Sequence, residues 1–151
     1  MRLEVFCLCD AATTHAGKLN LLGTFDTIMA REMPVVHPSC AIALRIRWDR
    51  IESNTNHRLA IQFVDEDGHE VIPRWEGNIV VNAPPERASS ATDLTLNLHR
   101  LKFEGYGQYA IDLAVDGRME ASLPLYVLPM PQDSPPPQPP SHEPPSHENG
   151  H

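Results

Sequence analysis

Basic residues are scarce in this sequence, and their scarcity limits what the protein can bind. The 151 residues include 12 Lys and Arg against 20 Asp and Glu, which gives a formal net charge of −8. A net-acidic chain lacks the positive field that sequence-independent binding to nucleic acid requires. Aromatic residues, which could stack on bases, make up only 6% of the chain. The composition therefore argues against nucleic acid as a partner.

Long apolar segments are also missing. No run approaches the roughly 18 apolar residues of a membrane helix, and Glu4 and Asp10 leave no apolar core for a secretory signal in the first ten residues. The three cysteines are an odd number, which suits a reducing compartment better than a framework of disulfides. We therefore expect a cytoplasmic protein with no membrane partner.

The motifs of common enzyme classes are absent. The sequence contains no G-x-S-x-G, no Walker A run, no G-x-G-x-x-G before a helix and no H-E-x-x-H. We accordingly assign no catalytic, cofactor-binding or metal-binding residue, and we expect no cofactor.

Two groups of residues have metal-like spacing, and neither predicts a metal site. Cys7-x-Cys9 and His37-x-x-Cys40 offer zinc ligands, but strand residues i and i+2 lie about 6.6 Å apart with parallel side chains. Zinc needs ligands that converge to about 2.3 Å from each sulfur. The cysteines are therefore interpreted as small buried hydrophobes. The acidic run at 65–70 is interpreted as a hairpin turn, because a calcium loop spreads its ligands over about twelve residues.

Alternation of apolar with small or polar residues is what the sequence has in abundance. It is clearest at 40–48 and at 108–127, and a period of two places the apolar residues on one face of a strand. Within the second range, Asp116-Gly117 is a preferred pair for a type I′ hairpin loop, since both positions need positive φ. This range is therefore predicted to be two antiparallel strands joined by a tight turn.

Weaker alternations extend the prediction to the whole domain. They predict strands at 3–10, 18–30, 59–63, 70–72, 79–81 and 94–99, with loops at 11–17, 31–38, 50–56 and 86–92, a bulge at Gly23 and a bend near Arg100. Eight or nine short strands without an amphipathic helix indicate an all-β fold, an antiparallel β-sandwich. Gly107-x-Tyr109 is similar to the tyrosine corner of immunoglobulin-like sandwiches, so we expect a sandwich of that kind.

The end of the chain differs in composition from the rest. Nine of the fifteen prolines follow Leu128, and Pro-Pro-Ser-His-Glu occurs twice, at 139–143 and 144–148. Such a segment has little apolar surface to bury. We therefore divide the chain into a β-sandwich domain at 1–128 and a proline-rich tail at 129–151, which is expected to be disordered.

Two surfaces are candidates for interaction. Arg45 and Arg47 point the same way from one strand and could bind phosphate, nucleic acid or an acidic partner, or they could be a solvated face paired with local acids such as Asp49 and Asp112. Phe6 and Leu8 lie on the opposite face of the first strand from its other apolar residues. Either that strand is covered on both faces, or Phe6 and Leu8 meet another subunit in a homodimer.

Several segments resemble a bacterial family of unknown function. They are Cys9-Asp10-Ala11-Ala12, residues 17–26, residues 57–61, residues 65–68, and Gly107-x-Tyr109 with Val115-Asp116-Gly117. The resemblance covers residues 1–128 and is most specific in the first thirty residues. It implies a small, soluble, all-β bacterial protein, and it transfers no activity and no site.

The function expected from these observations is binding without catalysis. The leading hypothesis is a β-sandwich module that interacts with a protein partner. The alternative is a small hydrolase or ligand-binding enzyme with a site at the first hairpin, where Asp10, His15 and Asp26 could meet.

Overall fold

A computed structural model describes residues 1–132 of the chain. Of the tail predicted at 129–151, Pro129 ends the last strand and residues 133–151 lie outside the described residues. The elements are β1 (Arg2–His15), β2 (Lys18–Thr24), β3 (Thr27–Ala30), β4 (Val35–Asp49), a short 3₁₀ turn (Arg50–Glu52), β5 (Asn56–Val64), β6 (Glu70–Val80), β7 (Ser89–Phe103), β8 (Gly107–Val115) and β9 (Arg118–Pro129). Over the described residues, none of the helical structure could span a lipid bilayer.

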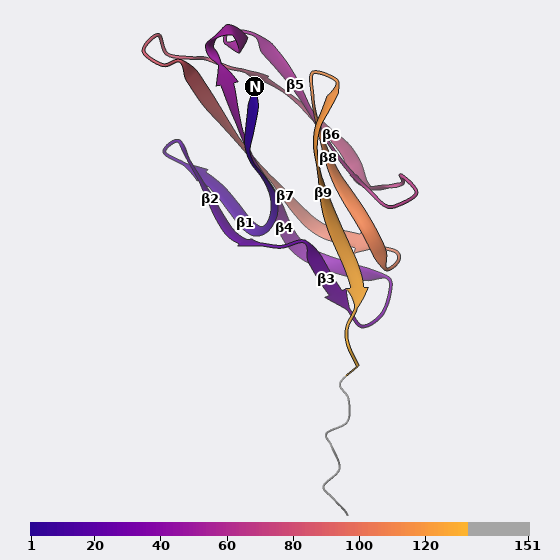
Figure 1. Ribbon diagram of the computed structural model, residues 1–151. Helices are drawn as coiled ribbons and strands as arrows, with labels where there is room; N and C mark the ends of the chain where they lie inside the picture. The colour runs from indigo at the N-terminus through magenta and orange to yellow at the C-terminus, as the bar shows by residue number, and fades with distance from the viewer. Residues whose placement is uncertain (133–151) are drawn as a thin grey trace, which may run out of the picture.

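The nine strands form two sheets that pack face to face (Figure 1). The first sheet has the order β2-β1-β4-β7 and the second has the order β3-β9-β8-β5-β6. All pairs are antiparallel except β3 with β9, which are parallel. The predicted all-β sandwich is confirmed, with one parallel pair at an edge that the sequence did not indicate.

The core lies between the two sheets and is built from the alternations seen in the sequence. Its largest fully buried side chains include Trp48, Phe63 and Phe103. The Phe103 ring contacts Phe63 at 5.9 Å and meets Tyr109 edge-on at 4.9 Å between ring centroids. Each large apolar side chain buried in this way stabilises the fold by about 1.5–3 kcal/mol, so the contact between the sheets dominates folding.

The best-determined local predictions are confirmed in β8 and β9. Val115 pairs with Arg118 across the turn, and Asp116 and Gly117 have φ of 50° and 80°, as a type I′ loop requires. The Tyr109 hydroxyl donates a hydrogen bond of 2.7 Å to the carbonyl of Gly105. That bond, from the start of a penultimate strand back to the chain just before it, is the tyrosine corner of immunoglobulin-like sandwiches.

Several predicted boundaries are wrong. Residues 11–15 continue β1 instead of forming a loop, because they pair with β2 as far as His15. The single strand predicted at 18–30 is two strands: β2 belongs to the first sheet and β3 to the second. The chain therefore crosses between the sheets at Phe25 and Asp26. Gly23 has φ of 67°, but the pairing register is the same on both of its sides, so it adds no extra residue.

Prolines and irregular residues are accommodated within longer strands than predicted. β4 begins at Val35 and passes through Pro38, and β6 is one strand of eleven residues that includes Pro73. The predicted bend near Arg100 is present as a left-handed residue with φ of 54°. Pairing of β4 with β7 is interrupted there, opposite Pro38, and keeps its register beyond it. The core-facing residues of β7 therefore switch from even to odd positions at Arg100, while the strand keeps the same register with β4.

A bulge in β1 changes which of its residues face the core. The pairing with β4 shifts by one between Leu3 and Val5, so Glu4 is an extra residue. Leu3, Phe6 and Leu8 consequently share the core side, and Leu8 is only 4% exposed. Leu8 is therefore buried in the core, and Phe6 is half-buried against it.

The outer side of β1 is covered as well. This agrees with the first of the two expected alternatives, in which the strand is covered on both faces. Cys9, Ala12, Ala41 and Ala43 form a second buried cluster, against which Cys7 and Leu19 pack. Leu19 belongs to β2, which is separated from β4 by β1 in the sheet order. The β1–β2 hairpin must therefore curl over the outer face of the first sheet, where small side chains leave it room.

Candidate functional site: the Arg45–Arg47 groove

The curled β1–β2 hairpin forms one wall of a groove on the outer face of the first sheet. The groove has a volume of about 520 Å³. We call it the Arg45–Arg47 groove, and its lining residues are Gly17, Arg45, Arg47, Arg87, Ala88, Ser89, Ser90, Ala91 and Asp93. They come from the tip of the hairpin, from β4, and from the start of β7 with the chain just before it. Three segments far apart in the sequence therefore build one concave polar site.

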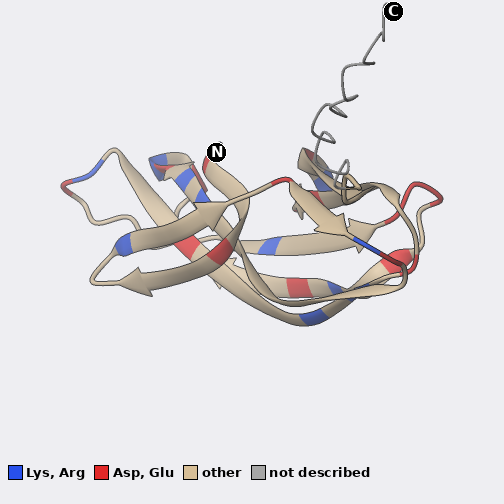
Figure 2. Cartoon of the chain, turned by 90° about the horizontal axis from the view of Figure 1, so that it is seen from below, with Lys and Arg blue, Asp and Glu red and all other residues tan. Residues whose placement is uncertain are grey.

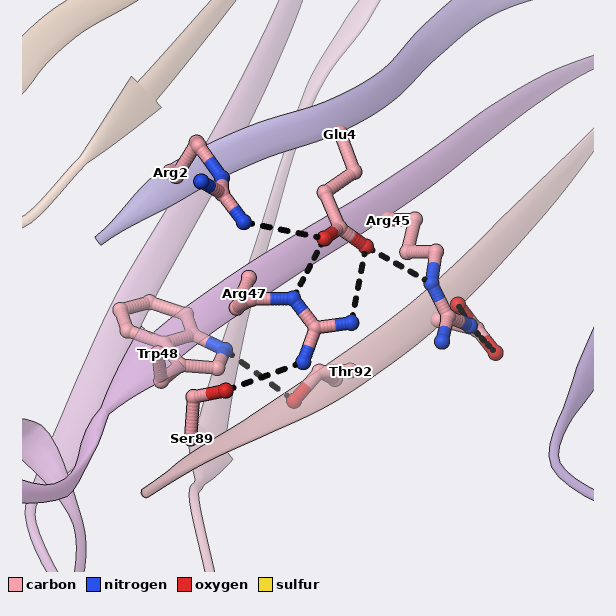
Figure 3. A network of polar contacts seen from close by, with 8 residues as sticks. Arg2, Glu4, Arg45, Arg47, Trp48, Ser89 and Thr92 are labelled. Atoms are coloured by element: carbon pink, nitrogen blue, oxygen red, sulfur yellow. Dashed lines mark hydrogen bonds and ion pairs between the residues drawn. The ribbon is translucent and has the colours of Figure 1, made fainter. Parts of the chain in front are cut away.

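Glu4 organises the two arginines on the floor of this site (Figure 3). Its carboxylate accepts a hydrogen bond of 3.0 Å from Arg45 Nε and further bonds from Nε and Nη2 of Arg47. Arg2 adds a looser ion pair at 3.7 Å. Because Glu4 is the bulged residue of β1, it is free of the regular ladder and can lie between the two guanidinium groups.

β7 holds the same arginines from the other side. Asp93 accepts two hydrogen bonds from Arg45 Nη1, at 2.7 and 2.9 Å, and the Ser89 hydroxyl accepts one from Arg47 Nη1 at 3.1 Å. In the next layer down, Trp48 Nε1 donates to the Thr92 hydroxyl at 3.2 Å. Each arginine is thus bound on two sides, which holds its guanidinium plane in one orientation.

The charges of this network persist at neutral pH. The hydrogen bond from Arg47 outweighs partial burial and lowers the pKa of Glu4. Asp93, with a further contribution from Glu4, raises the pKa of Arg45. Arg45 and Arg47 do pair with local acids, but the partners are Glu4 and Asp93 and not the expected Asp49 and Asp112.

Some hydrogen-bond donors in the groove have no acceptor among the described residues. Within residues 1–132, Arg45 Nη2 makes no hydrogen bond and Arg87 makes no ion pair. Three guanidinium groups line the groove, against the carboxylates of Asp93 and the adjacent Glu4. Elsewhere basic and acidic positions are interspersed over the strands (Figure 2). The groove is thus a local excess of positive charge in a chain of net charge −8.

The prediction of buried cysteines is confirmed for two of the three. All three are free, with Cys9 and Cys40 buried and Cys7 half-buried. Cys9 and Cys40 belong to different buried clusters, on the outer and inner sides of the first sheet. Burial raises the pKa of all three thiols, that of Cys40 to about 11. The thiols are therefore protonated at neutral pH.

The acidic run at 65–70 forms the predicted turn. Asp65 accepts hydrogen bonds from the backbone amides of Asp67 and His69, at 2.9 and 2.8 Å, and from the His69 ring at 3.2 Å. Oxygen and nitrogen atoms of these three residues lie within 4.8 Å of one another. The internal hydrogen bonds of the turn account for this proximity.

Within residues 1–132, no hydrogen bond, ion pair or cavity joins the three residues of the alternative enzyme hypothesis. Asp10 and His15 are five residues apart on the same strand. Of the three, only Asp26 lines a cavity described between the sheets, together with Cys7, Leu8 and Phe25 among other residues. The geometry therefore gives the hydrolase hypothesis no support.

Sequence reasoning identified Arg45 and Arg47 but missed the rest of their site. Glu4, Arg87 and Asp93 were not singled out, since Asp93 lies 48 residues from Arg45 along the chain. A single acid in an apolar strand was the available signal for Glu4. The bulge and the pairing with β4 are what place Glu4 between the two arginines.

Taken together, the two sheets, the tyrosine corner and the curled hairpin define a small all-β sandwich protein with a polar groove on one sheet. More particularly, the chain belongs to DUF6941, a family of unknown function, whose model matches residues 4–128. The match covers the sandwich from the bulged Glu4 to the last strand, and it agrees with the resemblance noted in the sequence. No curated protein matches the chain.

Proposed function

We propose that this protein is a non-catalytic binding module that holds an acidic segment of a partner protein in the Arg45–Arg47 groove. The observation that carries the proposal is the pre-ordered pair of guanidinium groups on the groove floor, with Arg45 Nη2 and Arg87 unoccupied. Arginines already held in place lose little side-chain entropy when they bind a carboxylate. A short acidic peptide therefore fits the charge and the size of the site.

A protein segment suits the groove better than nucleic acid does. Counterion release on DNA requires several free cations along an extended surface, whereas Arg45 and Arg47 are largely neutralised by Glu4 and Asp93. Base stacking requires exposed aromatic rings, and Trp48 beneath the groove is 1% exposed. The site offers a few directed donors, which match side-chain carboxylates.

The test is binding of a fluorescein-labelled polyglutamate peptide, followed by anisotropy with the full-length protein. We expect saturable binding at low ionic strength that weakens at physiological ionic strength, because the interaction is between exposed charges. Arg87→Glu reverses a charge without breaking any described ion pair, and it should weaken binding about fivefold. Arg31→Glu is the matched control, since Arg31 is an exposed arginine just after β3, outside the groove lining.

Three results would count against the proposal. The first is no binding of the peptide. The second is equal loss in the two variants, which would indicate attraction to overall charge alone. The third is tighter binding of a single-stranded oligonucleotide, which would replace the protein partner by a nucleic acid.

We further propose that the protein works in the cytoplasm of a bacterium. Three free cysteines, two of them buried and without a disulfide, are compatible with a reducing compartment. The bacterial assignment rests on the resemblance of the sequence to its family. Fractionation of the native host followed by immunodetection tests both parts, and recovery from a secreted or membrane fraction would contradict the first.

A further inference from the structure

The two long sides of the sandwich are closed in different ways. On one side the chain itself crosses from β2 to β3 and joins the two sheets. On the other side the edge strands β6 and β7 belong to different sheets and form no ladder with each other. A cavity of about 280 Å³ opens between them, lined by Ile42, Ile61, Ile72, Pro73, Trp75, Leu96, Asn97, Leu98, His99 and Leu101.

Most of the residues that line this cavity are apolar. Ile42 and Ile61, which are 0% and 2% exposed, bring it to the centre of the core. Its polar side chains, Asn97 and His99, are both exposed. A ligand that enters must therefore have an apolar body, with any polar atom near the mouth.

An irregularity in β6 shapes the wall. Between Ile61 and Phe63 of β5 the partner strand advances by three residues, from Trp75 to Ile72, so β6 contains an extra residue at Pro73 and Arg74. Ile72 and Trp75 are three residues apart and would face opposite sides of a regular strand. Because of the extra residue, both pack against the core. A bulge of this kind redirects side chains next to many binding sites.

Gly77 determines where the indole ring of Trp75 lies. A Cβ atom on Gly77 would come within 2.6 Å of Cη2 and 2.8 Å of Cζ2 of Trp75. The ring therefore lies directly over Gly77, where any larger residue would displace it. The indole ring of Trp75 forms part of the cavity wall.

We propose that this cavity binds a free, flat, uncharged aromatic compound of about two fused rings. A cavity of about 150 Å³ lined by apolar residues binds benzene, so 280 Å³ is suited to a bicyclic ring. Stacking or edge contact with Trp75 favours an aromatic ligand over an alkyl chain of equal area. The site is separate from the Arg45–Arg47 groove and does not depend on the function proposed there.

The experiment uses indole as the probe, titrated into the ¹⁵N-labelled full chain. We expect saturable shifts of the indole N–H signal of Trp75 and little change for Trp48, with Trp75→Phe used to assign the two signals. Gly77→Ala should displace the ring and weaken binding about tenfold, the loss expected for one aromatic contact. Gly105→Ala is the matched control, because a Cβ atom there meets nothing within 4 Å.

A second variant keeps the test decisive if Gly77→Ala unfolds. Leu98→Phe adds volume to the cavity wall and should also abolish the shifts of Trp75. Octanoate is the competing ligand, and tighter binding of octanoate than of indole would overturn the aromatic assignment. Absence of saturable indole binding, or equal binding by wild type, Gly77→Ala and Leu98→Phe, would overturn the site itself.

Discussion

His57 is the charged residue whose removal should cost most stability. It is 7% exposed, and its ring stacks on Trp48 at 4.2 Å between centroids. Nδ1 lies 2.8 Å from the Asp116 carboxylate and Nε2 lies 3.0 Å from the carbonyl of Glu52. Both neighbours are acceptors, so both ring nitrogens must donate, and that requires the doubly protonated, charged imidazole.

The magnitude follows from these contacts. A hydrogen bond between charged groups contributes about 1.5–3 kcal/mol, and an aromatic stack adds about 0.5–1.5 kcal/mol beyond burial. We therefore expect His57→Ala to lower the free energy of unfolding by about 2–4 kcal/mol, allowing for overlap between these terms. The Asp116 side chain would also lose its ring partner while keeping the hydrogen bond from the Arg58 amide.

The stability lost in His57→Ala should decrease as the pH rises above neutral. Burial alone would lower the pKa of His57, but Asp116 and the Glu52 carbonyl outweigh it and raise the pKa. This stabilisation is therefore complete below about pH 6.5 and is lost as the pH rises through the raised pKa. The hydrogen bond from His57 lowers the pKa of Asp116, so its contribution is present above about pH 3.8 and is lost as the pH falls. The difference between wild type and variant should be largest between these limits.

Urea unfolding followed by tryptophan fluorescence, at pH 5.5 and pH 8.5, measures this difference. His69→Ala is the control, because His69 also pairs with an aspartate, at 3.2 Å, but its side chain is 78% exposed. An exposed ion pair contributes little, so the control should be much milder. The reasoning fails if the two variants lose equal stability, or if the cost of His57→Ala grows as the pH rises.

Two further predictions test the fold. Tyr109→Phe removes the hydroxyl of the tyrosine corner and should cost about 0.5–1.5 kcal/mol in thermal or urea unfolding; an unchanged midpoint would mean that its bond to the Gly105 carbonyl contributes nothing. Reaction with a thiol reagent at pH 8 should modify Cys9 and Cys40 only after unfolding, because both are buried, and three rapidly reacting thiols in native protein would contradict this burial.

The elements predicted well are those whose signal is local. The alternations at 40–48 and 108–127 lie within β4, β8 and β9, because side chains of a strand alternate faces wherever the strand lies. The Asp116-Gly117 turn depends on the φ preferences of two residues, and the tyrosine corner on a short segment. Each of these features is encoded within a few neighbouring positions.

The predictions that failed needed information from distant residues. The extra residue at Glu4 is defined only by pairing with β4, more than forty positions away. The division of 18–30 into two strands depends on β9, which offers an edge to Thr27–Ala30. Neither partner can be identified from the local pattern, so the side of the sheet that Phe6 and Leu8 face could not be predicted.

The same distinction applies to the candidate sites. An all-β sandwich, cysteines without disulfides and a pair of arginines on one face of a strand could be predicted, because they follow from periodicity and composition. Three features became visible only in the folded chain: Glu4 and Asp93 bind those arginines, the hairpin tip lies beside them, and Trp75 lines a cavity between two edge strands. Such sites form where separate strands meet, and the order of strands in a sheet is set by packing of the whole chain.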